Sequence, residues 1–244
     1  MRLLTSILLY LLITPAQAGV ISIVIDDLGY SETLGQRAID LPAAVTLSVL
    51  PDTPHSNSLI NKASANGHEV ILHLPMQASD VAPQEPQTLT LDMGEWELKE
   101  KLQQLLSSYP GIAGVNNHMG SGMTRSDQQM QWLMQSLAER PDLFFLDSRT
   151  TALTVAQKQA GIHHVPNTRR DVFLDNEHND PEKIRAQLNI LINKAKRDGF
   201  ALAIGHPHAT TLRVLEQELP GLASQGIELV TVREYISRQS IQHR

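Results

Sequence analysis

Two adjacent carboxylates, Asp26 and Asp27, directly follow a run of aliphatic residues with the composition of a buried strand. Five of the six residues in 20–25 are Val or Ile. Two acids side by side repel each other, and a fold tolerates their burial when a cation or a catalytic proton balances them. The alternative is an acidic turn in which one Asp caps the next helix. Histidines at the ends of later strands favour the first interpretation.

Polar side chains recur where six of the predicted strands end. A single histidine is more often structural than a ligand, but a repeated pattern of this kind indicates residues that folding brings together. The side chains are Asp26 and Asp27 after the first strand, His73 after the third, Asn116, Asn117 and His118 after the fourth, Asp147 and Ser148 after the fifth, Arg170, Asp171 and Asp175 after the sixth, and His206 and His208 after the seventh.

Imidazole nitrogens and carboxylate oxygens are the ligands of Zn²⁺ and neighbouring divalent metals. One Asp and two His, with an open position for water, are sufficient for a catalytic site, in which the metal polarises a carbonyl and lowers the pKa of water. A second carboxylate takes the proton of the water and a histidine protonates the leaving group, roles that suit Asp26 and His206. This chemistry is the hydrolysis of an amide or an ester.

Strands that alternate with helices must position these residues. Alternation of this kind indicates a parallel sheet, either closed as a (β/α) barrel or doubly wound, and both place function at the carboxyl ends of the strands. We expect strands at 20–25, 44–49, 69–74, 112–115, 143–146, within 165–174, 201–204 and 227–230, and helices at 31–38, 57–66, 92–109, around 130–137, 154–160, 181–197 and 211–219, with a short helix at the end.

Several helix boundaries carry local signals. Gly67 and Gly199 are expected to end helices, and Asp180 before a proline is expected to begin one. Residues 92–95 resemble a capping box. One apolar stripe at helical spacing indicates core packing and consists of Met130, Leu133, Met134 and Leu137.

Four short motifs carry a family resemblance, which covers essentially the whole mature chain. They resemble the divergent branch of the polysaccharide deacetylase superfamily. The resemblance implies an α/β fold, a distorted (β/α) barrel with seven or eight mostly parallel strands in a single domain, and metal-dependent removal of acetyl groups from N-acetylated sugars. The motifs are Ile25-Asp26-Asp27-Leu28-Gly29, His73-Leu74-Pro75-Met76, Asn117-His118-Met119-Gly120-Ser121 and Gly205-His206-Pro207-His208.

The resemblance also implies roles for particular residues. The first Asp is the base, the second is a metal ligand and the late His is the acid, which here are Asp26, Asp27 and His206. The family places a second metal-binding His four residues after the first, a position that Gln77 holds in this chain. His118, at the end of the adjacent strand, is the expected replacement. The expected ligands of one divalent ion, with Zn²⁺ preferred, are therefore Asp27, His73 and His118.

Substrate-binding residues are expected around this centre. The Arg-Pro motif that orients the base in the family is absent, and Arg170, next to Asp171, can replace it. His208 has two open interpretations, orienting the substrate or forming a hydrogen bond within its own loop. The expected substrate-binding residues are Asp147, Arg170, Asp175 and His208, and the histidines expected to be structural or exposed are His55, His68, His163, His164, His178 and His243.

Composition limits the possible partners. The net charge is −6 and basic residues do not cluster, so nucleic acid is not an expected partner. Cysteine is absent, which excludes disulfides and thiolate ligands. Residues 1–18 have the features of a signal peptide: Arg2, an apolar run at 3–13, and cleavage after Ala18. We therefore expect the mature domain, 19–244, in the periplasm with no stable membrane span after signal cleavage; the alternative is a segment that stays uncleaved as an anchor.

Three functions remain open at this point. The first is a metal-dependent deacetylase acting on an amino-sugar polysaccharide of the cell envelope. The second is a non-catalytic carbohydrate- or envelope-binding protein that keeps the barrel, and the third is a metal hydrolase that cleaves a different amide. Aromatic residues make up 4% of the chain, which argues against a long aromatic-lined glycan groove.

Overall fold

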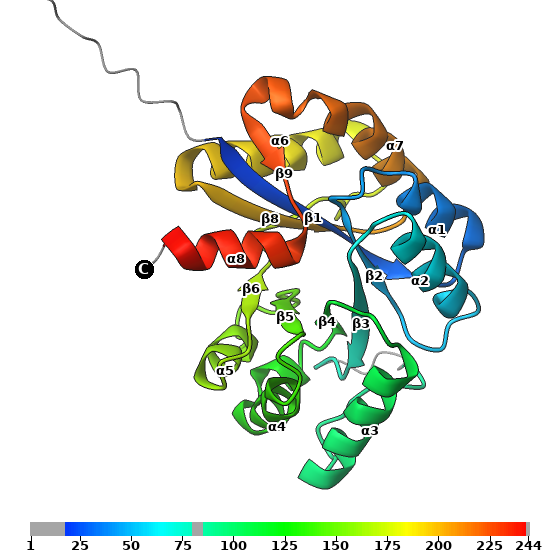
Figure 1. The fold of residues 1–244 in the computed structure, drawn as a ribbon, viewed down its shortest axis with the longest axis vertical. Coiled ribbons are helices and arrows are strands. Elements are labelled where there is room, and N and C mark those ends of the chain that lie inside the picture. Colours follow the sequence, from blue (N-terminus) through cyan, green and yellow to red (C-terminus); the bar gives the residue numbers. More distant parts are fainter. Residues whose placement is uncertain (1–17, 80–84, 243–244) are drawn as a thin grey trace, which may run out of the picture.

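The computed structural model describes residues 18–79 and 85–242, and it shows strands and helices in alternation (Figure 1). The expected signal peptide and His243 fall on residues outside this description, apart from Ala18 itself. The strands are β1 (Gly19–Leu28), β2 (Thr46–Val49), β3 (Val70–Met76), β4 (Gly114–Met119), β5 (Phe144–Asp147), β6 (Asn167–Arg169), β7 (Val172–Phe173), β8 (Phe200–Gly205) and β9 (Ile227–Leu229).

The helices lie between these strands, and among the described residues none is long and apolar enough to cross a membrane. They are α1 (Glu32–Ile39), α2 (Ser56–Ala65), α3 (Glu95–Ser108), α4 (Asp127–Ala138), α5 (Ala156–Ile162), α6 (Pro181–Asp198), α7 (Ala209–Glu218) and α8 (Val232–Gln242), with short 3₁₀ turns at Met123–Arg125, Leu219–Gly221 and Ala223–Gln225.

The described strands form one parallel sheet that curls into a distorted (β/α) barrel. Their order is β6-β5-β4-β3-β2-β1-β8-β7, and β9 pairs with β1 outside this path. Neighbouring strands pair in parallel throughout, for example Ile23 with Ala203 between β1 and β8. The barrel expected from the sequence is therefore confirmed.

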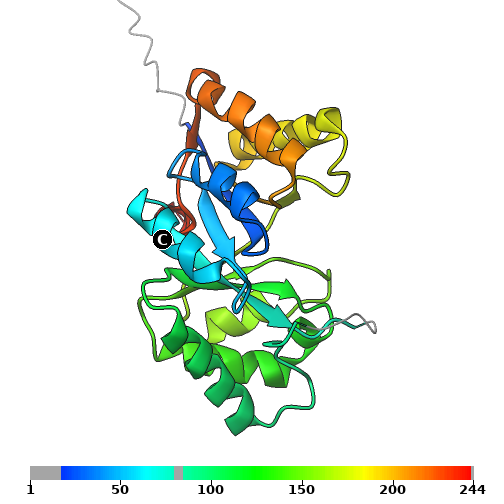
Figure 2. The same ribbon diagram turned by 90° about the vertical axis from the view of Figure 1, so that its right-hand side faces the viewer.

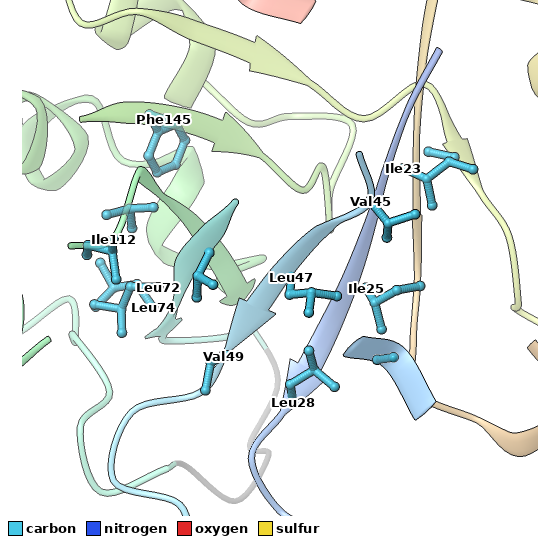
Figure 3. Packing of buried hydrophobic residues seen from close by; sticks show 14 of the residues in the cluster. Ile23, Ile25, Leu28, Val45, Leu47, Val49, Leu72, Leu74, Ile112 and Phe145 are labelled. Atoms are coloured by element: carbon cyan, nitrogen blue, oxygen red, sulfur yellow. The ribbon is translucent and has the colours of Figure 1, made fainter. Parts of the chain in front are cut away.

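Side chains on each strand alternate between two apolar cores, because successive residues of a strand point to opposite faces. On β1, Ile21, Ile23 and Ile25 belong to the large core that the surrounding helices cover, part of which Figure 3 shows. Val20 and Val24 belong to a smaller core on the concave face of the sheet. Helix α8 covers that second core, whose members are Val20, Val24, Ile71, Phe144, Leu146, Phe200, Leu202, Ile204, Val230, Val232 and Tyr235.

The helix boundaries follow most of the local signals. Ser31 caps α1 by accepting a hydrogen bond from Leu34, and the side chain of Asp180 caps α6 in the same way. Gly199 ends α6 with a φ of 85°, a conformation that glycine adopts without steric cost. The expected capping box at 92–95 is wrong: Gly94 is the N-cap of α3 and no side chain caps that helix.

Strand boundaries differ from the expected ones in several places that concern function. Strands β1 and β5 extend to Leu28 and Asp147, so that Asp26, Asp27 and Asp147 lie within strands. Strand β4 extends to Met119, so that Asn116, Asn117 and His118 lie within it and not beyond it. The strand expected within 165–174 is two short strands, β6 and β7, separated by Arg170 and Asp171. β6 pairs with β5 and β7 pairs with β8, so these two residues link opposite edges of the sheet.

Candidate active site

One carboxylate oxygen and two imidazole nitrogens converge at the carboxyl ends of β1, β3 and β4. Asp27 Oδ1 lies 3.0 Å from His73 Nε2 and 2.9 Å from His118 Nδ1. The two nitrogens are 3.2 Å apart, and the imidazole rings meet edge to face. The structure thus brings together the three residues that were expected to bind a metal, and they form one of two groups among the described residues that could hold an ion.

An unusual backbone conformation directs Asp27 into this site. The side chain of Asp26 lies on the concave face of the sheet, as those of Val20 and Val24 do. Regular alternation would therefore point Asp27 toward the opposite face. The φ of Asp27 is 57°, in the left-handed region that residues with a side chain rarely adopt. The pairing of β1 with β2 also shifts its register between Ile25 and Leu28. This local irregularity lets two adjacent carboxylates serve the same site, a use of strain that is common at functional sites.

The three ligand atoms fit a tetrahedral zinc ion. Asp27 Oδ1 is buried and has no hydrogen-bond donor, although two imidazole nitrogens lie within 3.0 Å of it. Bonds of about 2.0–2.1 Å in a tetrahedral site place neighbouring ligand atoms roughly 3.3 Å apart, close to the separations found here. Burial raises the pKa of Asp27, but contacts with His118 and His73 outweigh this effect and hold the pKa well below its usual range. Asp27 is therefore present as the carboxylate that a cation requires.

Asp26 is buried beside the metal-binding group and is held by an amide. Its Oδ1 accepts a hydrogen bond of 2.8 Å from Asn116 Nδ2, and its Oδ2 lies 3.6 Å from His73 Nε2. Asn116 has no exposed surface and also contacts Ser48, His73 and Ser148. One carboxylate oxygen of Asp26 is therefore fixed, and the other faces the ligand nitrogen of His73.

His206 approaches from β8 and is oriented by Asp175. Its Nδ1 lies 2.9 Å from Asp175 Oδ1, and its Nε2 lies 3.8 Å from Asp27 Oδ2. Burial lowers the pKa of His206, but the hydrogen bond and the charge of Asp175 raise it to about 9. The imidazole is therefore protonated at neutral pH, and its Nε2 faces the metal-binding group.

The position of Asp175 differs from the substrate-facing one that was expected. Its side chain has no exposed surface. Its Oδ2 accepts hydrogen bonds from the backbone N–H of His206 and from Thr211 Oγ1, at 2.7 and 2.8 Å. Both oxygens are thus used within the protein, and this geometry assigns Asp175 to the positioning of His206.

Asp147 and Arg170 contact the loop that follows β5. Asp147 is buried and accepts hydrogen bonds from the backbone of Arg149 and from the Thr154 hydroxyl. It follows Phe145 by two residues and so belongs to the helix-covered face, away from the concave face. Arg170 donates to the carbonyl oxygens of residues 148 and 149, and the described residues place no carboxylate within ion-pair distance of it. Arg170 therefore does not form an ion pair with Asp26, although its guanidinium lies over the Phe173 ring, which in turn packs against His206.

His208 lies at the rim of a small pocket beside the site. The pocket has a volume of about 180 Å³ and is also lined by Asp27, Tyr30 and His206. The ring of His208 stacks on that of His178, with 4.2 Å between the ring centres. A larger pocket, of about 630 Å³, lies between α5 and α8 and contains none of the site residues, so pocket size does not mark the site.

Asp175, His206 and His208 form the second group that could hold an ion. The oxygens of Asp175 already accept three hydrogen bonds within the protein. An ion there would have to displace them, whereas Asp27 Oδ1 has no donor to lose. The first group is the better candidate for a metal.

Four residues in contact with the site were given no role from the sequence, although two of them, Asn116 and Ser148, were noted at strand ends. The four are Ser48, Asn116, Ser148 and Thr211. The alternation of side chains between the two faces of a strand could have indicated three of them from the sequence. Ser48, Asn116 and Ser148 occupy every-other-residue positions facing the same side as Val24, Phe144 and Leu146, where a polar side chain needs a partner. In contrast, His68 is structural as expected, since its ring nitrogens contact the carbonyl oxygens of Val45 and Ile39.

This fold and this site define a polysaccharide-deacetylase-type barrel. The chain belongs to the divergent polysaccharide deacetylase family, whose family model matches residues 23–236. The resemblance noted in the four motifs is thus confirmed. The His and Asp groups at the strand ends provide possible metal-binding positions.

Similar proteins include one from Escherichia coli (strain K12), the uncharacterized protein YibQ. It is 42% identical over 204 residues, which are 84% of this chain and 63% of YibQ, so the match spans less than two thirds of that relative. The crystal structure of the uncharacterized protein ATU2773 from Agrobacterium tumefaciens C58 has a TM-score of 0.84 and 25% identity, covering 90% of this chain and 89% of that one.

A more distant structure shares the fold alone. It is a mutant of BA3943, described as a CE4 family pseudoenzyme with restored enzymatic activity. The TM-score is 0.58 at 12% identity, over 91% of this chain and 68% of that chain.

Proposed function

We propose that this protein is a metal-dependent hydrolase that removes acetyl groups from N-acetylated amino-sugar polysaccharide of the cell envelope. One observation carries the proposal: Asp27, His73 and His118 converge on a single point with a buried carboxylate oxygen that lacks a donor. Asp26 and the His206–Asp175 pair lie beside that point. A binding protein would need neither a buried base nor an oriented acid.

Zinc is the ion that we infer, because two imidazoles and one carboxylate leave a tetrahedral position open. Bound there, zinc supplies a Lewis acid for the acyl oxygen and for water. His73 and His118 contribute neutral nitrogens, and Asp27 contributes a negative charge that partly balances the ion.

The residues of the chain supply the proton transfers. Asp26 Oδ2, whose partner oxygen is held by Asn116, accepts a proton from the attacking water. Water adds to the acyl carbon and the C–N bond breaks, which releases acetate and the amine of the sugar. His206 donates its Nε2 proton to the departing nitrogen while Asp175 holds the other side of the ring. His208 and Tyr30 border the pocket beside these groups, where we place part of the substrate.

The cell envelope is part of this proposal. Arg2, the apolar run at 3–13 and the Ala16-Gln17-Ala18 segment have the features of an export signal that is cleaved after Ala18. A periplasmic location would give the enzyme access to peptidoglycan, which is an N-acetylated amino-sugar polymer. N-terminal sequencing of the secreted protein tests cleavage directly.

The decisive experiment measures zinc content and acetate release from N-acetylglucosamine oligomers and from peptidoglycan. The wild-type protein should bind one zinc ion and release acetate. Asp26→Asn should keep the zinc and lose turnover, since an amide cannot accept the proton. His206→Gln should keep the zinc and lose about 10²–10⁴-fold in rate, the usual contribution of a general acid.

Other outcomes separate the remaining functions. Zinc binding without hydrolysis of any acetylated substrate would support the envelope-binding alternative. Hydrolysis of a non-carbohydrate amide in preference to the oligomers would keep the site and change the substrate. Loss of zinc in Asp26→Asn would place Asp26 among the ligands.

A further inference from the structure

The side chain of Asn116 forms the centre of a buried hydrogen-bond network that joins the proposed base to a proposed metal ligand. Its Oδ1 lies 2.9 Å from His73 Nδ1 and 2.7 Å from Ser48 Oγ. Its Nδ2 lies 2.8 Å from Asp26 Oδ1 and 3.1 Å from Ser148 Oγ. An amide has two donor hydrogens and one oxygen with two lone pairs, so all of its hydrogen-bonding capacity is used.

The role of Asp26 as the proposed base determines which way this amide faces. A carboxylate that is to accept a proton offers only acceptors, so the group 2.8 Å from Asp26 Oδ1 has to be the NH₂ of Asn116. The flipped amide would place its oxygen against a carboxylate oxygen inside the protein, where an unfavourable contact between two acceptors is costly. The orientation of Asn116 is therefore fixed by its neighbour and is not arbitrary.

The orientation of the amide in turn fixes the tautomer of His73. Because Asn116 presents its oxygen to Nδ1, that ring nitrogen has to carry the hydrogen. The neutral ring then has its lone pair on Nε2, the nitrogen that lies 3.0 Å from Asp27 Oδ1 in the metal-binding group. Ligand histidines in metal sites are commonly held by such a second hydrogen bond.

We propose that Asn116 is a positioning residue whose amide holds both the proposed base Asp26 and the proposed metal ligand His73. One side chain thus leaves Asp26 Oδ2 free as the base and directs His73 Nε2 toward the metal. This inference rests on the proposed function for its use of zinc, but the tautomer of His73 is a property of the protein itself. No contact between Asn116 and the substrate is involved, since the residue is fully buried.

The first test is whether Nδ1 of His73 carries a hydrogen in the wild-type protein, measured by nitrogen NMR of the zinc-loaded protein and of the metal-free protein. We expect the hydrogen on Nδ1 in both. A neutral His73 with its hydrogen on Nε2 would overturn the inference without any variant. If the wild-type protein binds no zinc, the proposed function fails, and the metal-free measurement still decides the role of Asn116.

The second test uses Asn116→Asp, which keeps the shape and replaces the NH₂ by an acceptor, and Asn116→Leu, which removes both groups. Each should weaken zinc binding by about 10–100-fold, the usual cost of losing such a supporting partner. Asn116→Asp should also change the pH dependence of hydrolysis, because the new carboxyl group faces Asp26. Unchanged zinc affinity and an unchanged His73 tautomer in a folded Asn116→Asp protein would contradict the inference.

Asn117→Asp is the matched control. Asn117 is the next residue on the same strand and is also buried, but its amide binds the backbone of Ser148 and of Met119 on the other side of β4. The same substitution there should lower thermal stability without changing the tautomer of His73. Equal losses of zinc affinity in both variants would show that disruption of β4, and not the network, causes the effect.

Discussion

Asp27, His73 and His118 each offer a single ligand atom to the candidate metal position, so the loss of one leaves two. A zinc ion held by two protein ligands is exposed to water and exchanges readily, whereas three ligands are usual in a catalytic site. The set therefore has no redundancy, and each member can be tested alone.

His118→Ala should remove most of the bound zinc, as measured by elemental analysis after gel filtration. Asp27→Ala and His73→Ala should have the same effect for the same reason. His163→Ala serves as the control, because His163 lies at the end of α5 and belongs to neither metal-binding group. Stoichiometric zinc in His118→Ala would move the ligand set toward His206 or His208.

Asp175→Asn should lower the pKa of His206 in the metal-free protein from about 9 toward the ordinary 6.5. A raised pKa in the folded state stabilises the fold fully below 6.5, and this stabilisation disappears as the pH rises through about 9. The wild type should therefore exceed Asp175→Asn in unfolding free energy by a few kcal/mol more at acidic pH than at alkaline pH. NMR titration of His206 and urea unfolding at both pH values measure the two effects.

A stability difference between wild type and Asp175→Asn that is independent of pH would contradict this expectation. It would show that the Asp175 carboxylate stabilises the fold only through its hydrogen bonds with Thr211 and with the backbone of His206.

The sequence was sufficient to predict that Asp27, His73 and His118 come together, because the ends of parallel strands meet at one edge of a sheet. It did not reveal how Asp27 reaches the site, since a positive φ has no signal in an aspartate. The expectation that functional residues gather at strand ends also does not say on which face of the sheet a side chain lies. Asp147 lies on the helix-covered face, and Asp175 is enclosed behind His206, so neither position could be obtained from the spacing alone.

Strands carry the site because their concave faces change from apolar to polar along their length. On β1, Val20 and Val24 pack in the core that α8 covers, and Asp26 follows at the next but one position. On β3, Ile71 precedes His73 in the same way. This alternation was readable, and it could also have indicated Ser48 and Asn116 within their strands. Asn116 was instead treated as a sign of the strand's end, and Ser48, inside a predicted strand, was given no role.

Left-handed residues follow these polar side chains on two further strands. Met119 comes directly after His118 and Arg149 directly after Ser148, with φ values of 52° and 50°. Asp27 has the same relation to Asp26. In each case a left-handed residue directly follows a residue that contacts the site.

Asp180→Ala should lower the free energy of unfolding by about 1 kcal/mol, because the side chain of Asp180 accepts hydrogen bonds from the first turn of α6. Zinc affinity should remain unchanged, since α6 contributes no ligand. Chemical denaturation and zinc titration measure the two quantities. Asn179→Ala, at the neighbouring exposed position, is the control and should change neither.

The whole barrel should be stabilised by zinc, because the ligands come from β1, β3 and β4 and assemble only in the folded chain. At a free zinc concentration about 100 times the dissociation constant, the gain is about 2.7 kcal/mol, provided that the unfolded chain does not bind the ion. This corresponds to a rise of several degrees in Tm for a protein of this size. Differential scanning fluorimetry with zinc and with a chelator measures the difference.

The same titration on His118→Ala provides the control. A full rise in Tm in that variant would mean that zinc stabilises the protein from another position. The absence of any rise in the wild type would contradict the ligand set itself.

The two ends of the sheet are joined by a single peptide bond rather than by a ladder of hydrogen bonds. The backbone N–H of Arg170 donates to Asp147 at the end of β5, whereas that of Asp171 donates to Leu202 in β8. In Figure 2 the yellow and orange helices α6 and α7 lie in the upper part of the molecule and the green helices α3 and α4 in the lower part. Two neighbouring amides thus report on opposite ends of the sheet. Hydrogen exchange at Arg170 follows the opening of the end that contains β5, and exchange at Asp171 follows the opening of the end that contains β8.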